Sequence, residues 1–500
     1  MRNSDSAGNA YGLFATRATR ALAFVLLLAF AAILESAKLS SLRDPEIWGH
    51  LRIGAWILEH KSWPRSGLFS QFPDLPWSDF TWGFDSIATI AYRFAGLRAL
   101  PALLIVFRIS LAALTFRLAG GWRNFWSAAG LSAIAQYVLF PMGPIAAFVS
   151  LLLFGVELVL LLEIRESGNS RRLLALPVLF FLWANLDIGF VYGIVLYAMF
   201  FIVLLFEKWG QSRNLHWLPH LAAQIPLQTA GLAGGACLFA SFLTPNTFHA
   251  YGAFFANEFS AVNKYLLGYS PMGFRQPQDY ALMLLAMAAF LSLGLLRSRD
   301  LFQIGVLSGC AALAFHARWE NWLLALASVA VIGHAILRKP ERSGRVITLP
   351  GNWQRLALSG AAFASAFLVF AIHVPRNQDL LLATVAERLP VHAADFLRQH
   401  PMPAPLFNSF QCGGFLTWYL PEYPVVIDAR RGLYPEEHEL DYFKVMNVDI
   451  PYKSFPPLKQ ARTLLLDKGG VMSEAFRGVP GFQVVYEDGI SIVYSHEVEE

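Results

Sequence analysis

Residues 21–50 read ALAFVLLLAFAAILESAKLSSLRDPEIWGH and contain two features that decide the fold. The first is an apolar run near 19–39. At about 1.5 Å per residue, it is long enough to cross about 30 Å of hydrocarbon. The second is the group of ionisable residues Asp44, Glu46 and His50, which lie within seven positions of one another. The stretch predicts a membrane helix followed directly by a polar cluster at the membrane surface.

The composition of the whole chain is typical of a membrane protein. Of its 500 residues, 56% are hydrophobic and 15% are charged, whereas about a quarter of the residues of soluble proteins are charged. The net charge of +4 is spread among apolar runs, so nucleic acid is not an expected partner. The cysteines Cys237, Cys310 and Cys412 are isolated from one another, which excludes a disulfide framework or a Cys-based zinc site.

The N-terminus has two interpretations. Arg17 and Arg20, followed by an apolar run, resemble the start of a cleaved signal peptide. The run continues into Glu35 and Lys38 without a small-residue cleavage pattern. We interpret it as a retained first helix with its N-terminus in the cytoplasm.

Further apolar runs predict about eleven helical spans. Residues 172–206 form one stretch that is too long for a single span, and we expect a hairpin that turns near Asn185 to Gly189. The expected spans are 19–39, 99–117, 124–142, 145–164, 172–186, 188–206, 221–243, 280–296, 301–316, 320–337 and 354–374.

The positions of Arg and Lys predict the orientation of these spans. Alternate short loops contain basic residues, whereas the turns at 141–144 and 185–187 contain none. Cytoplasmic loops are the ones enriched in Arg and Lys. The loops 40–98, 244–279 and the tail after 375 are therefore expected outside the cytoplasm, on a bacterial inner membrane. The expected cytoplasmic side has Arg117, Arg123, Arg165, Arg171, Arg172, Lys208, Arg213, Arg297, Arg299, Arg338, Lys339, Arg342 and Arg345.

Two parts of the chain are expected outside the bilayer. Helical spacing of apolar residues at 48–58 and 80–95 predicts two amphipathic helices on the membrane surface, within the loop 40–98. We assign 1–374 to a transmembrane domain and 375–500 to an extracytoplasmic α/β domain. The latter has expected strands at 406–409, 424–428, 463–467, 483–487 and 490–494, and helices at 383–399 and 436–445.

The cluster after the first span offers two chemical roles. Asp44 and Glu46 are candidate ligands for a divalent cation such as Mg²⁺ or Mn²⁺, or one of them is a general base tuned by the other. Asp44 followed by Pro45 is also a common start of a helix, in which Asp44 only caps the backbone. Spacing alone leaves both interpretations open.

A family resemblance favours the chemical roles. Residues 44–70 read DPEIWGHLRIGAWILEHKSWPRSGLFS and, with Trp77, Asp79 and Trp82 after them, look like the first external loop of bacterial multi-spanning proteins related to the GT-C glycosyltransferases. The similarity continues at 183–193 (WANLDIGFVYG), at 243–252 (LTPNTFHAYG) and at 407–435 (FNSFQCGGFLTWYLPEYPVVIDARRGLYP). The resemblance implies sugar transfer from a polyprenyl-phosphate carrier, with Asp44 as the catalytic carboxylate and Glu46 and His50 beside it.

The resemblance also points to substrate-binding residues. Asp187 stands where the related pattern has His, so it either supplies a ligand for metal or substrate or removes an imidazole that would face the phosphate. The structural alternative is that it caps the turn of a membrane hairpin. His249, Arg275 and Arg318 fall at the expected outer surface, where Arg side chains suit a carrier phosphate. For Arg318 the alternative is anchoring of its span beside Trp319.

The tail contains a further candidate site. An expected strand at 424–428 ends at Asp428, Arg430 and Arg431, and α/β sheets commonly bind ligands at the carboxyl ends of their strands. A loop held by an Asp428 and Arg430 pair is the alternative. We assign this domain to binding of an acceptor or partner.

Together these features predict a membrane glycosyltransferase that uses a polyprenyl-phosphate-linked sugar and an envelope glycan, lipid or protein acceptor. The alternative is a non-catalytic membrane protein or transporter whose outer domain recruits an envelope partner. The intramembrane polar residues Arg108, Gln136 and Glu157 are few for a transport path.

Overall fold

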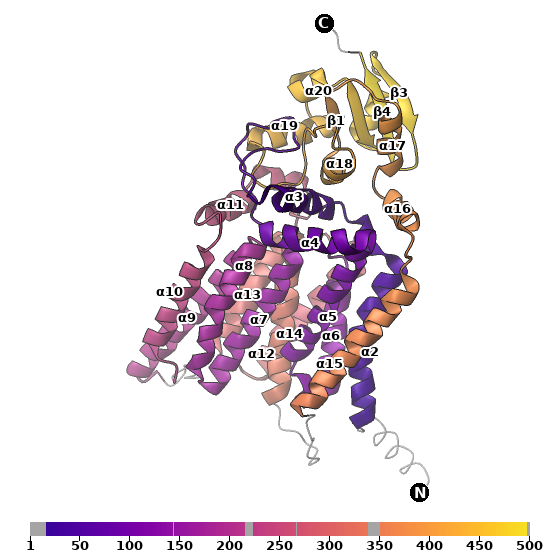
Figure 1. The fold of residues 1–500 in the computed structure, drawn as a ribbon. Coiled ribbons are helices and arrows are strands. Elements are labelled where there is room, and N and C mark those ends of the chain that lie inside the picture. The colour runs from indigo at the N-terminus through magenta and orange to yellow at the C-terminus, as the bar shows by residue number, and fades with distance from the viewer. Residues whose placement is uncertain (1–16, 144, 216–223, 267, 339–350, 498–500) are drawn as a thin grey trace.

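The protein consists of a helical bundle covered at one end by a second layer (Figure 1). The computed structural model describes residues 17–143, 145–215, 224–266, 268–338 and 351–497. The chain enters at the lower end of the bundle through α2 and ends in strands of the upper layer. The two layers are therefore built from both ends of the sequence.

In the described residues, eleven helices occupy the predicted apolar runs. Seven described stretches are long and apolar enough to cross a membrane, one of them combining α4 and α5, while α6, α8, α10 and α13 are shorter. The number of spans thus stays a prediction. The bundle helices are α2 (Arg17–Lys38), α5 (Ala99–Leu118), α6 (Phe125–Val138), α7 (Ala146–Ser167), α8 (Ala175–Leu186), α9 (Phe190–Ser212), α10 (Leu227–Ser241), α12 (Pro277–Leu295), α13 (Leu301–His316), α14 (Asn321–Arg338) and α15 (Asn352–His373).

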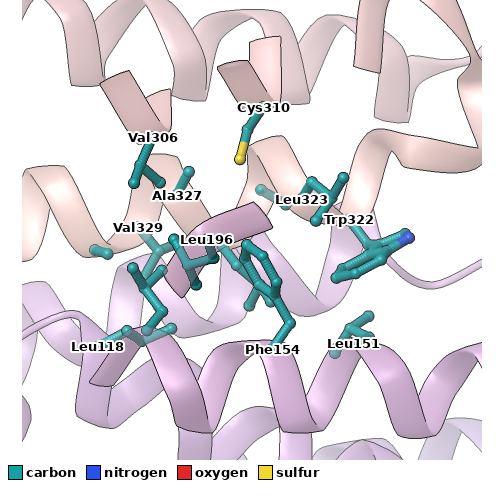
Figure 2. Close-up of a cluster of buried hydrophobic side chains, with 14 of the residues drawn as sticks. Leu118, Leu151, Phe154, Leu196, Val306, Cys310, Trp322, Leu323, Ala327 and Val329 are labelled. Carbon is teal, nitrogen blue, oxygen red and sulfur yellow. The ribbon is translucent and has the colours of Figure 1, made fainter. Parts of the chain in front are cut away.

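The core of the bundle is centred on α14. Figure 2 shows Trp322 and Leu323 of α14 among side chains from neighbouring helices, including Phe154 of α7 and Leu196 of α9. At Gly333 a Cβ would lie 2.5 Å from the Cα of Ala119. A small residue is needed there because lipid supplies little hydrophobic driving force and bundle helices associate through close packing.

Charged residues join the helices at the end of the bundle opposite the second layer. Arg165 of α7 donates to Glu207 of α9 at 2.7 Å and to Asp300, the N-cap of α13, at 2.9 Å. Glu163 pairs with both Arg117 and Arg172. These contacts agree with the prediction that the basic loops lie on one side; Lys339, Arg342 and Arg345 lie outside the described residues.

Helices are present at the two predicted positions as α3 (Ile47–His60) and α4 (Trp82–Ala95), which lie across the top of the bundle (Figure 1). Their place at a membrane surface stays a prediction. The hydroxyl of Thr89 donates to the carbonyl of Leu51 at 3.1 Å and joins them. Other short elements lie near the junction of the layers: α11 (His249–Glu258), η1 (Ser40–Arg43), η2 (Gly96–Arg98), η5 (Ala261–Tyr265) and η6 (Arg318–Glu320). At the opposite end of the bundle, η3 (Gly121–Asn124) joins α5 to α6 and η4 (Ser170–Leu174) joins α7 to α8.

The C-terminal part contains a four-stranded sheet in the order β1-β2-β4-β3, with β1 and β2 parallel and the other pairs antiparallel. Helices lie beside and below this sheet (Figure 1). The elements are α16 (Gln378–Ala386), α17 (Val391–Gln399), β1 (Leu406–Asn408), η7 (Phe410–Cys412), α18 (Gly413–Tyr419), α19 (Glu436–Met446), η8 (Tyr452–Ser454), α20 (Pro456–Gln460), β2 (Thr463–Asp467), α21 (Val471–Phe476), β3 (Phe482–Glu487) and β4 (Ser491–His496).

Two predictions for this part are wrong. The single helix expected at 383–399 is two helices, α16 and α17, separated at Pro390 because proline disfavours a helical conformation in the residue before it. The strand expected at 424–428 does not join the sheet. Val425 instead exchanges backbone hydrogen bonds with the outer loop: its N–H donates to Phe69 at 3.2 Å and its carbonyl accepts from Gln71 at 2.9 Å.

The outer loop and the C-terminal part share a hydrophobic core. Trp48 of α3 meets Phe415 of α18 edge to face at 5.3 Å, and both side chains are buried. Ile53 and Trp77 belong to the same buried cluster as Tyr442 of α19. The predicted boundary at 374/375 stays a prediction, but the loop 40–98 packs as part of the upper layer.

The orientation predicts the behaviour of reporter fusions. Alkaline phosphatase, which is active only outside the cytoplasm, should be active when fused after residue 400 and inactive when fused after residue 168, because these positions lie at opposite ends of the bundle. Colony or lysate phosphatase activity, normalised to fusion abundance, measures this. The reverse pattern would place the upper layer in the cytoplasm.

Candidate functional site

A cavity of about 720 Å³ lies between the top of the bundle and the C-terminal part. Among the described residues, its walls come from α3 and α4, the segment 69–81 between them, the starts of α7 and α9, residues 254–266, 268–269 and 319–322, and residues 409–447 with Asp467. Ligand sites commonly occur in such concave spaces between structural layers. The cavity is the candidate functional site.

The lining of this cavity is strongly acidic. Nine carboxylates face only three basic side chains, His50, Arg430 and Arg431. Such an excess of like charge in a partly buried space raises carboxylate pKa values or attracts cations. The acidic lining residues are Glu46, Asp79, Asp85, Asp187, Glu258, Glu320, Asp428, Glu439 and Asp467.

Of the predicted cluster, Glu46 and His50 line the cavity and Asp44 lies just behind them. The Asp44 Oδ1 atom accepts a hydrogen bond from the Glu46 N–H at 2.9 Å. A Cβ at Gly143 would lie 1.7 Å from Asp44 Oδ2, so only glycine fits beside this carboxylate. Helix α3 begins at Ile47 with Glu46 as its N-cap, so Asp44 holds the turn before the helix.

The Asp44 and Glu46 carboxyls influence each other's titration. Burial and the neighbouring Glu46 charge raise the pKa of Asp44 to about 7. Burial also raises the pKa of Glu46, although His50 and Arg431 oppose this shift. One proton is therefore easily exchanged at this pair near neutral pH, which is what a general base requires.

His50 is oriented by α4. Its Nδ1 atom lies 2.7 Å from Oδ1 of Asp85 and 3.5 Å from the hydroxyl of Thr81. Burial alone would lower the pKa of His50, but Asp85, Asp79 and Glu46 outweigh it and raise the pKa to about 9. His50 is thus a cation at neutral pH, next to the Asp44 and Glu46 pair.

Asp79 is a cavity residue that was not among the predicted site residues. Its Oδ1 accepts from the backbone and hydroxyl of Thr81 at 2.9 and 3.0 Å, and no described residue donates to Oδ2. Burial and the nearby Asp85 raise the pKa of Asp79 to about 8. The only signal for Asp79 in the sequence is its place in the family resemblance.

Asp187 has the predicted turn-capping role, and its binding role stays a prediction. Its Oδ2 accepts a hydrogen bond from the Ser150 hydroxyl and another from the Gly189 N–H at 3.0 Å, so it does cap the turn into α9. It also lines the cavity, with 7% of its surface exposed. The capping and binding interpretations are therefore compatible.

Arg431, which the sequence placed with a separate candidate site in the tail, belongs to this cavity. Its guanidinium lies 5.6 Å from the centre of the Tyr269 ring. The negative charges of Asp187, Glu46 and Glu258 favour the protonated form of this guanidinium. The Arg431 carbonyl accepts a hydrogen bond from the indole of Trp77 at 3.0 Å. This contact fixes the loop that presents Arg431 to the cavity.

The adjacent Arg430 has a structural partner. It forms an ion pair with Asp428 at 2.7 Å, donates through Nε to both Asp428 oxygens, and donates to the carbonyl of Leu68. The predicted alternative, a loop held by Asp428 and Arg430, is therefore observed. Of the two arginines, Arg431 is therefore the one that interacts with the cavity carboxylates Asp187, Glu46 and Glu258.

The other predicted carrier residues lie outside the cavity lining. Arg318 pairs with Asp279 at 3.3 Å, Arg275 is exposed, and the exposed His249 stacks on Phe248 at 4.3 Å. Their roles in binding the carrier stay predictions. Among the cavity residues, the cations available for a phosphate are His50 and Arg431.

The predicted divalent cation has a poor set of ligands. No three His, Cys, Asp or Glu side chains of the described residues are grouped as a metal site. Asp44 uses one oxygen for the Glu46 N–H, and hard cations such as Mg²⁺ need several oxygen ligands. The residues present do not fit a metal held by protein alone, so no catalytic step is assigned to one.

The fold is shared with known enzymes. No protein-family model matches the chain, and no curated protein matches its sequence. Among solved structures, the archaeal oligosaccharyltransferase AglB from Archaeoglobus fulgidus, in complex with an inhibitory peptide and a dolichol-phosphate, is 12% identical with a TM-score of 0.52. That alignment covers 95% of this chain and 74% of AglB. The chain has the GT-C fold.

Two further structures are similar to this chain. The apo form of the Archaeoglobus fulgidus oligosaccharyltransferase is 12% identical, with a TM-score of 0.52 over 89% of this chain and 69% of its own. ArnT from Cupriavidus metallidurans, bound to undecaprenyl phosphate, is 14% identical, with a TM-score of 0.44 over 94% of this chain and 97% of its own. The predicted relation to GT-C proteins is confirmed at the level of the fold by the oligosaccharyltransferase.

The His50 and Asp85 contact predicts a measurable titration. Asp85 is the largest of the three acidic influences that raise the pKa of His50 to about 9, so Asp85→Asn should lower the pKa of His50. The stability that this pair contributes should be fully present below about pH 6.5 and lost as pH rises through about 9. Reaction of His50 with diethylpyrocarbonate, followed by peptide mass spectrometry against pH, measures the shift. An unchanged profile in Asp85→Asn would contradict the coupling.

Proposed function

We propose that this protein is a membrane glycosyltransferase that moves a sugar from a polyprenyl-phosphate carrier to a hydroxyl of a cell-envelope acceptor, on the outer face of the membrane. The observation that carries the proposal is the cavity at the top of the bundle, where Glu46, His50 and Arg431 meet. The AglB fold supports it, since that enzyme was solved with a dolichol-phosphate and a peptide.

The position of the cavity suits a lipid-linked donor. It lies above the apolar helices and below the C-terminal part, with Ile145, Ile188 and Trp322 from the bundle among its lining residues. A carrier whose prenyl chain stays in the lipid would present its phosphate at this level. The upper layer then leaves room for an acceptor beside Phe410 and Phe443.

The cations of the cavity fit the leaving group. As the bond between the sugar C1 and the carrier phosphate breaks, the phosphate oxygen keeps the electron pair and gains negative charge. Arg431 and protonated His50 stabilise that charge in a partly buried site. Asp85 orients the His50 ring, and Trp77 holds the backbone of Arg431.

The Asp44 and Glu46 pair supplies the base. The acceptor hydroxyl oxygen forms the new bond to C1 from the face opposite the phosphate, and its proton passes to this carboxylate pair. Glu46 is the member that lines the cavity, and its charge helps to raise the pKa of Asp44, whose Oδ1 atom accepts from the Glu46 N–H. Attack from the opposite face inverts the configuration at C1.

The transporter alternative is less well supported. Arg108 donates to the carbonyls of Phe140 at 2.6 Å and Met142 at 3.3 Å, and Gln136 reaches only its own helix at Ser132. Glu157 is buried against Gly193. These residues have separate neighbours among the described residues and do not form a connected polar path. Recruitment of an envelope partner by the upper layer stays the alternative.

The base is tested with two isosteric variants. Glu46→Gln and Asp44→Asn should each lower sugar transfer about 10²–10⁴-fold, the usual cost of losing a general base, with little change in abundance. Asn still caps the turn before α3, so stability should fall by less than about 1 kcal/mol. Label transfer from a panel of polyprenyl-phosphate sugars to membrane acceptors is the assay. Full activity of either variant would remove that residue from the base.

The phosphate site is tested by a matched pair of conservative changes. Arg431→Lys should raise the apparent KM for the lipid-linked sugar, because lysine cannot bind phosphate through two parallel hydrogen bonds. Arg318→Lys keeps the charge opposite Asp279 outside the cavity and should leave KM unchanged. KM is measured for each variant at equal membrane abundance. If KM rises for Arg318→Lys and not for Arg431→Lys, the carrier phosphate binds at Arg318, as predicted from the sequence.

A further inference from the structure

One end of the cavity differs from the Glu46 and His50 end. Glu258 of α11 and Glu320 of η6 approach each other there through Tyr192 of α9, whose hydroxyl lies 3.2 Å from Glu258 Oε1 and also donates to Glu320. One hydroxyl has a single proton to donate, so it cannot satisfy both carboxylates at once. The pair is short of hydrogen-bond donors.

Glu320 has an oxygen with no partner. The residue is 2% exposed, it lines the cavity, and no described residue donates to its Oε2 atom. A buried carboxylate oxygen without a donor is costly unless a ligand supplies one. The positive charge of Arg431 also acts on Asp187, Glu46 and Glu258.

Aromatic side chains enclose the same two carboxylates. The ring of Tyr192 meets those of Phe254 at 5.0 Å and Trp322 at 5.7 Å, both edge to face. Trp319 and Tyr269 complete the wall, and the Trp319 N–H donates to the Gly268 carbonyl at 2.7 Å. Aromatic faces beside carboxylates bind ammonium groups, by attraction to the ring face and by charge-assisted hydrogen bonds.

We propose that the Glu258, Glu320 and Tyr192 end of the cavity is a subsite for a primary ammonium group carried by one of the two substrates. This inference rests on the proposed function, because it names the chemical class of a substrate of the same cavity. An ammonium group brings three donors and one positive charge. It therefore supplies both things that this end of the cavity lacks, whereas a neutral hydroxyl supplies only a donor.

The ammonium group has two sources to distinguish, the transferred sugar and the acceptor. The test uses purified full-length protein in detergent with EDTA present, so that no divalent cation bridges the carboxylates. Binding by isothermal titration calorimetry is measured for prenyl-phosphate-linked glucosamine and its N-acetyl form, and for free glucosamine and its N-acetyl form. A preference for the amine in the first pair assigns the group to the donor sugar, and a preference in the second pair alone assigns it to the acceptor.

In the pair that matches the true source, the amine should bind at least about tenfold more tightly than its N-acetyl form, since acetylation removes the charge that the buried carboxylates require. Glu320→Gln and Glu258→Gln should abolish this preference while keeping side-chain size. Glu439→Gln is the matched control, because it removes another cavity carboxylate that lies on α19. It should leave the preference intact.

Three results would overturn the subsite. The first is equal binding of the amine and N-acetyl forms in both pairs by the unmodified protein. The second is a preference for the amine that survives in the Glu258→Gln, Glu320→Gln double variant. The third is an equal loss of that preference in Glu439→Gln, which would indicate only a general acidic potential. The first needs no variant to fold. Transfer assays separate this inference from the proposed function. If the protein transfers only neutral sugars, and only to neutral acceptors, the subsite is refuted while the glycosyltransferase function is supported.

Discussion

The packing of the outer loop against the C-terminal part is the constraint on which the site depends. Trp48 meets Phe415 in a buried edge-to-face contact, and the backbone of Val425 bonds to that of Phe69 and Gln71. These contacts join segments that are more than 300 positions apart in the sequence. With the bonds from Trp77 to the Arg431 carbonyl and from Arg430 to the Leu68 carbonyl, they set the relation between the loop containing Glu46 and the loop containing Arg431, and they give the cavity its upper wall.

The same packing explains the electrostatics of the cavity. Glu46, Asp85 and Asp187 come from the outer loop and the bundle, whereas Asp428 and Glu439 come from the C-terminal part. Bringing them into one partly buried space is unfavourable unless protons, fixed cations or bound substrate compensate. His50 and Arg431 provide part of that compensation, and a proton on Asp79, whose pKa is raised to about 8 by burial and Asp85, would provide more. The acidity thus points to ligands that carry donors or positive charge.

Several features of the fold could be predicted from the sequence because they depend on local pattern. Apolar runs predicted the bundle helices, since backbone groups in lipid must bond within their own segment. Helical spacing predicted α3 and α4, and local composition predicted β1, β2 and α19. The segment 424–428 was mispredicted as a strand of the sheet, because its apolar residues suit any buried extended chain. Its actual partners are the Phe69 and Gln71 backbone and the Asn408 side chain.

By itself the sequence determined the membrane class, the alternating basic loops, the polar cluster of Asp44, Glu46 and His50, and the GT-C resemblance. Only the tertiary structure decided which charged residues share the cavity. Arg430 and Arg431 are neighbours with the same chemistry, yet Arg430 is paired with Asp428 and Arg431 faces the cavity carboxylates. Likewise Arg318 is paired with Asp279, while Glu320, two positions later, faces the cavity. The physical reason is that periodicity fixes which side of a helix is apolar, whereas the partner of a polar side chain depends on segments that are distant in sequence.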